Sequence, residues 1–203
     1  MSGMEQAPTR SAVLELKGER VVVGEAYDFL DEKRLLLAAE LLRQLEAYDR
    51  LQREFETLRQ QAVHALVKAV ARHGLQGLEV YPADNIEAGQ FNCETSNFMG
   101  VTLARAGMRL PDADTGKMPA NPSAAVRACQ AAFRELLLRA AQLAGVSGNL
   151  HRLLAEYRLT ERRARALENV ILPEIEQSLK VMTTHLEELE FEDTMRVRRQ
   201  AGI

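Results

Sequence analysis

The chain of 203 residues is short of the residues that build aromatic-rich cores and sharp turns. It has no tryptophan, and aromatic residues make up only 5% of it. No proline lies between Pro8 and Pro82, and no glycine lies between Gly24 and Gly74. Leu and Ala mixed with Glu, Arg and Gln fill these stretches, a composition that favours long helices and coiled coils over a compact α/β domain.

Cysteines, long apolar runs and excess charge are also scarce. Cys93 and Cys129 are the two cysteines, far apart and without a CxxC motif, so we expect reduced thiols in a cytoplasmic protein. No apolar run reaches the roughly 18 residues of a membrane span, and the opening MSGMEQAPTR lacks the apolar core of a secretory signal. We therefore expect no direct membrane insertion. The net charge of −3 gives no argument for nucleic acid and disfavours a helical nucleic-acid-binding protein.

The residues of common catalytic and metal sites do not occur in a recognisable arrangement. No phosphate-binding glycine loop is present, and the four histidines are not at the spacing of metal ligands. The acidic run EELEFED (187–193) is best explained as a solvated helix face. The sequence therefore predicts no catalytic residue, no metal site and no cofactor.

Turn-forming residues concentrate in the middle of the chain. Six of the twelve glycines and four of the six prolines fall between residues 74 and 122. This predicts an N-terminal coiled-coil helix over 9–73, an irregular head over 74–122 and a C-terminal coiled-coil helix over 123–200. Asn121-Pro122-Ser123 is a candidate helix start with proline at an early helical position. In the head, the strand-like segments NFMGVTLARA (97–106) and LEVY (78–81) predict a small β-hairpin or short sheet.

The first helix carries a heptad repeat, which is the pattern of a coiled coil. Its apolar a and d positions alternate at spacings of three and four without a slip. The a positions are Val13, Tyr27, Leu41, Tyr48, Phe55, Ala62 and Ala69, and the d positions are Leu16, Val23, Leu30, Leu37, Leu51, Leu58 and Ala65. Arg20, Arg34 and Gln44 place polar groups in this seam, which can determine its register. About 60 helical residues would form a rod of roughly 95 Å.

The second helix has a less regular apolar stripe, which changes phase close to Pro173. A regular alternation of three and four residues runs from Leu172 to Leu189, and Gly145 and Gly148 predict a bend or break further upstream. Two rods of similar length should fold back on each other to bury their stripes. The expected fold is mainly α: a long antiparallel two-helix coiled coil formed by the N- and C-terminal helices, with a small head containing a short β-hairpin.

Basic side chains gather at two places in the C-terminal helix. They are Arg158, Arg162, Arg163 and Arg165 in one cluster, and Arg196, Arg198 and Arg199 in the other. These clusters are either ordinary exposed helix charge balanced by nearby glutamates, or a guanidinium girdle that binds carboxylates of a surrounding partner. Spacing alone does not decide between the two.

The segment ERRARALENVILPEIEQSLK (161–180) resembles a motif in the D subunits of the V-type and archaeal A-type rotary ATPases, which typically reads R-R-V-N-A-L-E-x-V-[IV]-[IL]-P-x-[IL]-E-x-[ST]-[IL]-[KR]. The matching residues are Arg162, Arg163, Ala166, Leu167, Glu168, Val170, Ile171, Leu172, Pro173, Ile175, Glu176, Ser178, Leu179 and Lys180. Ala164-Arg165 departs from the usual Val-Asn. Three further segments resemble the same family: APTRSAVLELKGERVVVGEAYDFLDEKRLLL near the start, NFMGV (97–101) in the head and EFEDTMRVRRQ (190–200) at the end.

The resemblance implies a non-catalytic rotor shaft of the central stalk that couples ATP hydrolysis or synthesis to ion transport. It implies that the paired helical ends enter a ring of catalytic A and B subunits, and that the head and lower part bind the F subunit and the C (or d) subunit above the membrane ring. It also implies a cytoplasmic location, peripheral to the membrane within the V1/A1 sector. Candidate contacts with the catalytic ring are Arg162, Arg163, Arg165, Lys33, Arg34, Arg196, Arg198 and Arg199. Pro173 is expected to kink the shaft and make it eccentric.

A prefoldin-like coiled-coil chaperone or scaffold is the alternative. Prefoldins also join two helices through β-hairpins, but they are shorter and lack the R-R-x-x-A-L-E-x-x-x-x-P run. The sequence leaves open whether protons or sodium ions are moved and whether ATP is made or hydrolysed, because membrane subunits set the first and neither is encoded in this chain.

Overall fold

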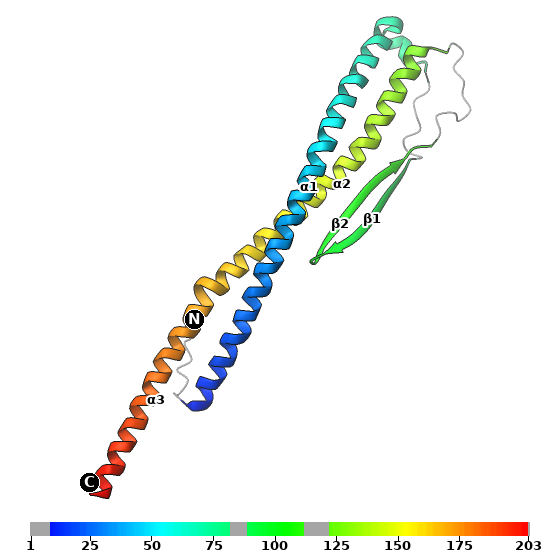
Figure 1. Cartoon of the computed structure of the whole chain (residues 1–203). Helices are drawn as coiled ribbons and strands as arrows, with labels where there is room; N and C mark the ends of the chain where they lie inside the picture. Colours follow the sequence, from blue (N-terminus) through cyan, green and yellow to red (C-terminus); the bar gives the residue numbers. More distant parts are fainter. Residues whose placement is uncertain (1–8, 82–88, 112–121, 203) are drawn as a thin grey trace. The chain divides into compact units, whose positions relative to one another are not determined.

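The structure, a computed structural model, describes residues 9–81, 89–111 and 122–202. Its elements in chain order are helix α1 (Arg10–Leu78), strand β1 (Gln90–Phe98), strand β2 (Val101–Arg109), helix α2 (Ala124–Ala166), the π-helical turn η2 (Leu167–Ile171) and helix α3 (Leu172–Ala201) (Figure 1). The described chain is thus mainly helical, with long helices packed together and an antiparallel two-stranded hairpin between them in sequence. This confirms the predicted fold class.

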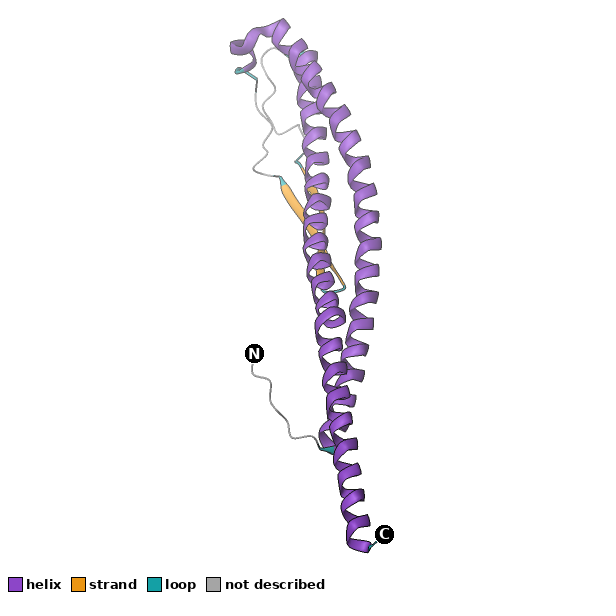
Figure 2. Ribbon diagram, turned by 90° about the vertical axis from the view of Figure 1, so that its left-hand side faces the viewer, coloured by secondary structure: helices purple, strands orange, loops and turns teal. Residues whose placement is uncertain are grey.

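The chain groups into two compact units. One consists of Met1–Leu36 with Tyr157–Ile203, and the other of Leu37–Glu156. The first unit pairs the start of α1 with the end of α2, η2 and α3. The second pairs the rest of α1 with most of α2 and holds the hairpin, drawn in orange in Figure 2. The predicted division into segments 9–73, 74–122 and 123–200 follows the order of the chain, whereas these two units are grouped by their contacts. The predicted segments therefore stay a prediction.

Within each unit the paired helices run antiparallel, as two cross-helix contacts in each unit show. In the first unit Arg10 pairs with Glu190, and further along α1 Arg20 Nη2 lies 3.2 Å from Oε1 of Glu176, which comes earlier in α3. In the second unit Glu54 Oε2 lies 3.4 Å from Arg139 Nη1, and further along α1 His73 meets Ser123, which comes just before α2. Every apolar a and d residue of the predicted heptad in α1 is buried or half-buried. The buried seam of α1 therefore lies where the heptad predicted it. Complete burial of one apolar side chain stabilises the fold by roughly 1.5–3 kcal/mol, which is why these residues face the partner helix.

Local chemistry explains where the helices begin and end. Thr9 caps α1, because its Oγ1 accepts a hydrogen bond from the Ala12 N–H at 3.2 Å. Gly74 interrupts α1 near its end with φ 68° and ψ 167°, a conformation open to glycine. The Ser123 carbonyl accepts a hydrogen bond from the Arg127 N–H at 3.1 Å, so Ser123 is the residue directly before the first turn of α2. Pro122 lies before this helix, so its predicted place inside the first turn is wrong, and Asn121 lies outside the described residues.

Strands β1 and β2 form a hairpin closed by a two-residue turn. Their register runs from Gln90 opposite Arg109 to Phe98 opposite Val101. The turn residues Met99 and Gly100 both have positive φ, 50° and 86°, which suits the twist of a tight hairpin. The predicted hairpin is present, but 97–106 spans its turn and is not a single strand. The strand expected at 78–81 is wrong, because the chain there finishes a helix and enters a turn.

The predicted break at Gly145 and Gly148 is also wrong, because α2 runs through both. Gly145 serves packing instead: a Cβ at this position would lie 2.6 Å from the Ala106 Cβ on β2. One turn later, the Asn149 side chain exchanges two hydrogen bonds with the Ala104 backbone, at 2.8 and 2.9 Å. The hairpin therefore lies directly on α2, and glycine permits that contact.

The π-helical turn η2 comes immediately before Pro173. Proline has no N–H to donate, and its ring collides with the carbonyl four residues earlier in a regular α-helix. The wider turn of η2 removes this conflict, and the Leu172 N–H donates to the Leu167 carbonyl to close it. The helix thus continues past the proline into α3, while the predicted kink at Pro173 stays a prediction.

Candidate functional site

The arginines at the end of α2 are solvent-exposed. Arg165 Nη2 pairs with Glu161 Oε1 at 2.7 Å on the same helix face. Arg162 donates from Nε to the Arg158 carbonyl at 3.3 Å. The Arg163 side chain is also exposed and makes no hydrogen bond or ion pair with another described residue. Exposed pairs of this kind contribute little to stability, so these guanidinium groups remain available to a partner.

The basic pair in α1 is less accessible. Lys33 and Arg34 are half-buried, and Arg34 Nη2 lies 2.5 Å from Asp31 Oδ1. The neighbouring carboxylate already balances the Arg34 charge. A partner would therefore meet a partly neutralised surface here.

The arginines near the end of α3 extend into solvent. Arg196 Nη1 lies 3.7 Å from Asp193 Oδ1, and Arg198 and Arg199 occupy the last turn of the helix. Positive charge at a helix C-terminus is favourable, because it meets the unpaired carbonyls of the last turn. Arg198 and Arg199 therefore also stabilise the end of their own helix, independently of any partner.

All eight predicted contact residues and Pro173 lie in the first unit. The structure does not join them into one cluster, however. The arginines of α2 and those of α3 are separated by about 30 residues of helix, or roughly 45 Å. Their role as contacts with a ring stays a prediction.

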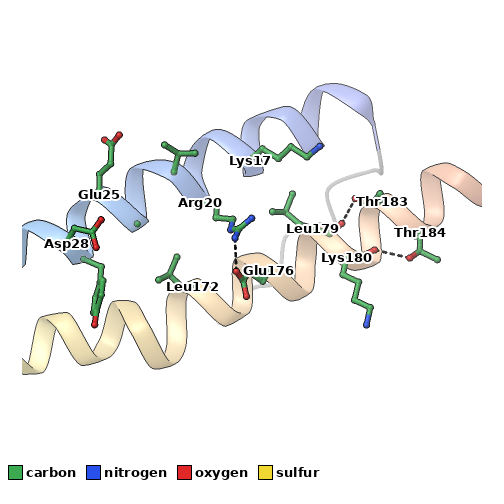
Figure 3. A pocket seen from close by; sticks show the side chains of 13 residues that line it. Lys17, Arg20, Glu25, Asp28, Leu172, Glu176, Leu179, Lys180, Thr183 and Thr184 are labelled. Carbon is green, nitrogen blue, oxygen red and sulfur yellow. Dashed lines mark hydrogen bonds and ion pairs between the residues drawn. The ribbon is translucent and has the colours of Figure 1, made fainter. Parts of the chain in front are cut away.

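A groove between α1 and α3 is the feature that sequence reasoning missed (Figure 3). It has a volume of about 1010 Å³ and is open to solvent. Its lining residues are Lys17, Arg20, Val21, Gly24, Glu25, Tyr27, Asp28, Leu172, Glu176, Leu179, Lys180, Thr183 and Thr184. The available signal was Arg20, a charged residue at an a position of the heptad.

Tyr27 and Glu168 connect this groove to η2. The negative charge of Glu168 raises the pKa of the Tyr27 hydroxyl, with smaller contributions from burial and from Asp31. The Tyr27 hydroxyl and the Glu168 carboxylate are therefore close enough to interact electrostatically. This contact ties the a position of α1 to the π-helical turn.

Metal-binding clusters and membrane spans are both absent from the described part of the chain. Across residues 9–81, 89–111 and 122–202, no three His, Cys, Asp or Glu side chains gather in a way that could hold a metal ion. No helix in those ranges combines the length and hydrophobicity that a bilayer crossing requires. His73 has a structural contact, since its Nε2 lies 2.7 Å from the Ser123 hydroxyl.

Comparison with known proteins identifies the family. Residues 12–201 match the family model of the ATP synthase D subunit. The D subunit of the V-type ATP synthase of Thermotoga neapolitana is 29% identical over 97% of both chains. The D subunit of the A-type ATP synthase of Pyrococcus abyssi is 30% identical over 97% of this chain and 93% of its own. The D subunit of the V-type ATP synthase of Thermus thermophilus is 27% identical over 97% and 87%.

The match spans both helical halves and the hairpin, which leaves the prefoldin-like alternative without support. The heptad of α1 and the segment around Pro173 both lie within the matched residues. The chain therefore belongs to the family of ATP synthase D subunits, the non-catalytic central-stalk subunits of V-type and A-type rotary ATPases.

Proposed function

We propose that the paired helices act as the rotor shaft, which transmits torque between a catalytic ring and a membrane rotor ring. The antiparallel seam between α1 and the helices of the C-terminal half is the observation that carries this proposal. Two helices that share a buried apolar seam resist twisting, because neither turns without dragging the other. The ion pair between Arg20 and Glu176 and that between Glu54 and Arg139 link the same helices side by side.

The partners follow from family membership. The A and B subunits of the catalytic ring surround the paired chain ends, while the F subunit and the C (or d) subunit engage the head and lower part. The shaft then lies on the cytoplasmic face, peripheral to the membrane in the V1/A1 sector. The names of the relatives support only the membership in an ATP synthase, and the individual contacts belong to this proposal.

The exposed arginines of α2 are the strongest candidates for contact with the ring. Guanidinium groups form paired hydrogen bonds with carboxylates, so a ring of carboxylate-bearing subunits would recognise them. Arg162, Arg163 and Arg165 are exposed, and only Arg165 among them forms an ion pair within the described chain. Lys33, Arg34, Arg196, Arg198 and Arg199 would supply further contacts along the same unit.

The test is reconstitution with the A, B and F subunits from the same organism. Native mass spectrometry counts the copies of this chain per complex, and ATP hydrolysis is followed in parallel. A triple variant carries Arg162→Ala, Arg163→Ala and Arg165→Ala. We expect one copy in a ring of six subunits, and a lower affinity of the triple variant for the ring, because three charge-assisted contacts are lost.

A matched control variant carries three arginine-to-alanine substitutions elsewhere on the chain. Arg50, Arg72 and Arg127 are also exposed but lie in the second unit, so their replacement by alanine should leave binding to the ring unchanged. A wild-type chain that stays outside the ring would overturn the shaft function. Equal affinities for the two triple variants would overturn only the arginine contacts.

A further inference from the structure

The inward face of the C-terminal helical half follows two regular repeats that are out of step by one residue. Up to the end of η2, one set of buried or half-buried residues recurs at spacings of three and four: Tyr157, Thr160, Ala164, Leu167 and Ile171. In α3 a second set recurs at the same spacings: Leu172, Ile175, Leu179, Met182 and Leu186. Each member of the second set lies one residue later than a continuation of the first set would place it. The helix therefore contains one surplus residue between the two repeats.

The exposed residues of α3 show that the first repeat does not continue. Its spacing would place four residues on the inward face that are all exposed: Glu174, Ser178, Val181 and His185. By contrast, Ile175 in the second repeat is only 6% exposed. A helix that is out of step by one residue presents a face turned by about 100°. Without a correction, α3 would therefore turn its apolar residues away from α1.

The π-helical turn η2 supplies this correction. It is closed by a hydrogen bond from the Leu172 N–H to the carbonyl of Leu167, which encloses one residue more than an α-helical turn does. The chain is buried on both sides of η2, at Ala164 (2% exposed) and at Ile175, whereas no residue of η2 itself is buried. Packing therefore requires a wider turn somewhere between Ala164 and Ile175, but it does not decide where.

Pro173 decides where the wider turn lies. In a regular α-helix the proline ring would collide with the carbonyl of Asn169, and the proline nitrogen has no hydrogen to donate. A wider turn directly before the proline relieves this collision, whereas a wider turn elsewhere in the helix would leave it in place. Pro173 is exposed, so its effect comes through the backbone and not through packing of its side chain.

We propose that η2 is a phase adjuster: it takes up the surplus residue, and Pro173 fixes it at one place, so that α3 keeps a single rotational setting on α1. Pro173 is then a positioning residue and not the cause of the wider turn. This property belongs to the chain by itself and does not depend on its partners. In the proposed shaft, the rotational setting determines which side chains of α3 face outward.

Two changes separate the surplus residue from the proline that positions it. Pro173→Ala removes the proline and keeps the surplus residue. Deletion of Val170, an exposed residue of η2, removes the surplus residue, because Leu172 then follows Leu167 at the regular spacing. Deletion of Gln177, an exposed residue of α3, is the matched control, because it interrupts a repeat that is already regular. Both deletions are made in the Pro173→Ala chain.

The place of the wider turn is measured as a distance across it. Spin labels are attached through Arg163→Cys and Val181→Cys, which change exposed residues on either side of η2. The two native cysteines are first removed by Cys93→Ser and Cys129→Ala, so that only the labelled positions carry a thiol. A wider turn at one fixed place gives a narrow distribution of distances, and a wider turn that moves along the helix gives a broad one.

We expect a narrow distribution for wild type, a broad one for Pro173→Ala, and a narrow one again when Val170 is also deleted. Hydrogen exchange of the backbone amides between residues 164 and 175 should be fastest in Pro173→Ala, because the moving turn opens its hydrogen bonds. Urea denaturation gives a second comparison. In the Pro173→Ala chain, deletion of Val170 should raise the urea midpoint, because a continuous α-helix replaces the wider turn, and deletion of Gln177 should lower it.

Two results would overturn the proposal. A narrow distribution of distances in Pro173→Ala would mean that the proline is not what holds the wider turn at one place. Equal urea midpoints for the deletions of Val170 and Gln177 would mean that no residue is surplus at η2. All these measurements use the isolated full-length chain, so neither result bears on whether the chain acts as a rotor shaft.

Discussion

At the residue scale, Glu40 and Glu56 show how burial decides the value of an ion pair. Glu40 is only 8% exposed and accepts hydrogen bonds from Arg43 at 2.6 and 2.7 Å and from Gln44 at 2.8 Å. The Arg43 hydrogen bonds lower the pKa of Glu40, against the opposing effect of burial. Arg59 and Gln60 hold the pKa of Glu56 at about 2, yet its side chain is 42% exposed, so water and salt screen that pair.

The cost of replacing Glu40 should depend on pH in a defined direction, because the wild-type carboxylate titrates and its replacement does not. Because its folded pKa lies below the usual 4.5, the ionised carboxylate stabilises the fold above that pH. This contribution is lost as the pH falls through the folded pKa. We expect Glu40→Gln to reduce the free energy of unfolding by about 1 kcal/mol at pH 7, and the difference from wild type to shrink below pH 4.5. Chemical denaturation at several pH values measures it.

The control for this prediction is Glu56→Gln, whose carboxylate makes similar contacts on the exposed surface. We expect a smaller effect than at Glu40, and one that weakens further at high salt. If Glu56→Gln destabilised the chain as much as Glu40→Gln, burial would not be the deciding factor.

At the scale of elements, the contact between the hairpin and α2 depends on one missing methyl group. The Gly145 backbone faces Ala106, and the Asn149 amide pairs with both backbone groups of Ala104. Asn149 also accepts a hydrogen bond from Arg152 Nη2 at 2.7 Å. Gly145 thus lets β2 come close to the α2 backbone, and Asn149 holds the strand there.

The two glycines of α2 should respond in opposite directions to the same substitution. A Cβ at Gly145 would meet Ala106 at 2.6 Å, so Gly145→Ala should destabilise the chain by about 1–3 kcal/mol. At Gly148 the nearest atoms are the mobile end of Arg152 at 3.6 Å, so Gly148→Ala should stabilise by up to about 1 kcal/mol through helix propensity. Thermal unfolding compares them, and Ala106→Gly should rescue Gly145→Ala. Similar effects of both substitutions would contradict the contact.

At the scale of the whole molecule, Pro173 and η2 lie in the helix that carries the candidate ring contacts. The π-helical turn accommodates the proline without ending the helix, so α3 continues the structure that α2 begins. Our hypothesis is that the proline makes the shaft eccentric, so that different faces of the shaft would meet successive catalytic sites.

Pro173→Ala distinguishes an effect of the proline on the stability of the chain from an effect on ATP hydrolysis by the complex. Alanine restores a backbone N–H and is the best helix former, so the free energy of unfolding should rise by about 1–3 kcal/mol. If the proline makes the shaft eccentric, ATP hydrolysis by the reconstituted complex should fall even though the shaft is more stable. Pro122→Ala, outside the helix, is the control. A more stable variant with unchanged turnover would mean that the proline is merely tolerated.

The sequence by itself determined the helices, their seam and the family. A heptad is a local repeat, so Val13, Leu37 and Ala69 reveal the buried face of α1 without knowledge of its partner. The strand-like segment 97–106 is also a local pattern and predicted a small hairpin, although the two strands were placed imperfectly.

Only the tertiary structure decided which distant residues meet. The contact of Gly145 with Ala106, the clamp of Asn149 on Ala104 and the pairing of Arg20 with Glu176 join residues far apart in the chain. Such contacts depend on the register between packed elements, and a shift of one turn would replace each of them. A periodic pattern tells which face of a helix is buried, but it does not tell which residue of the partner stands opposite.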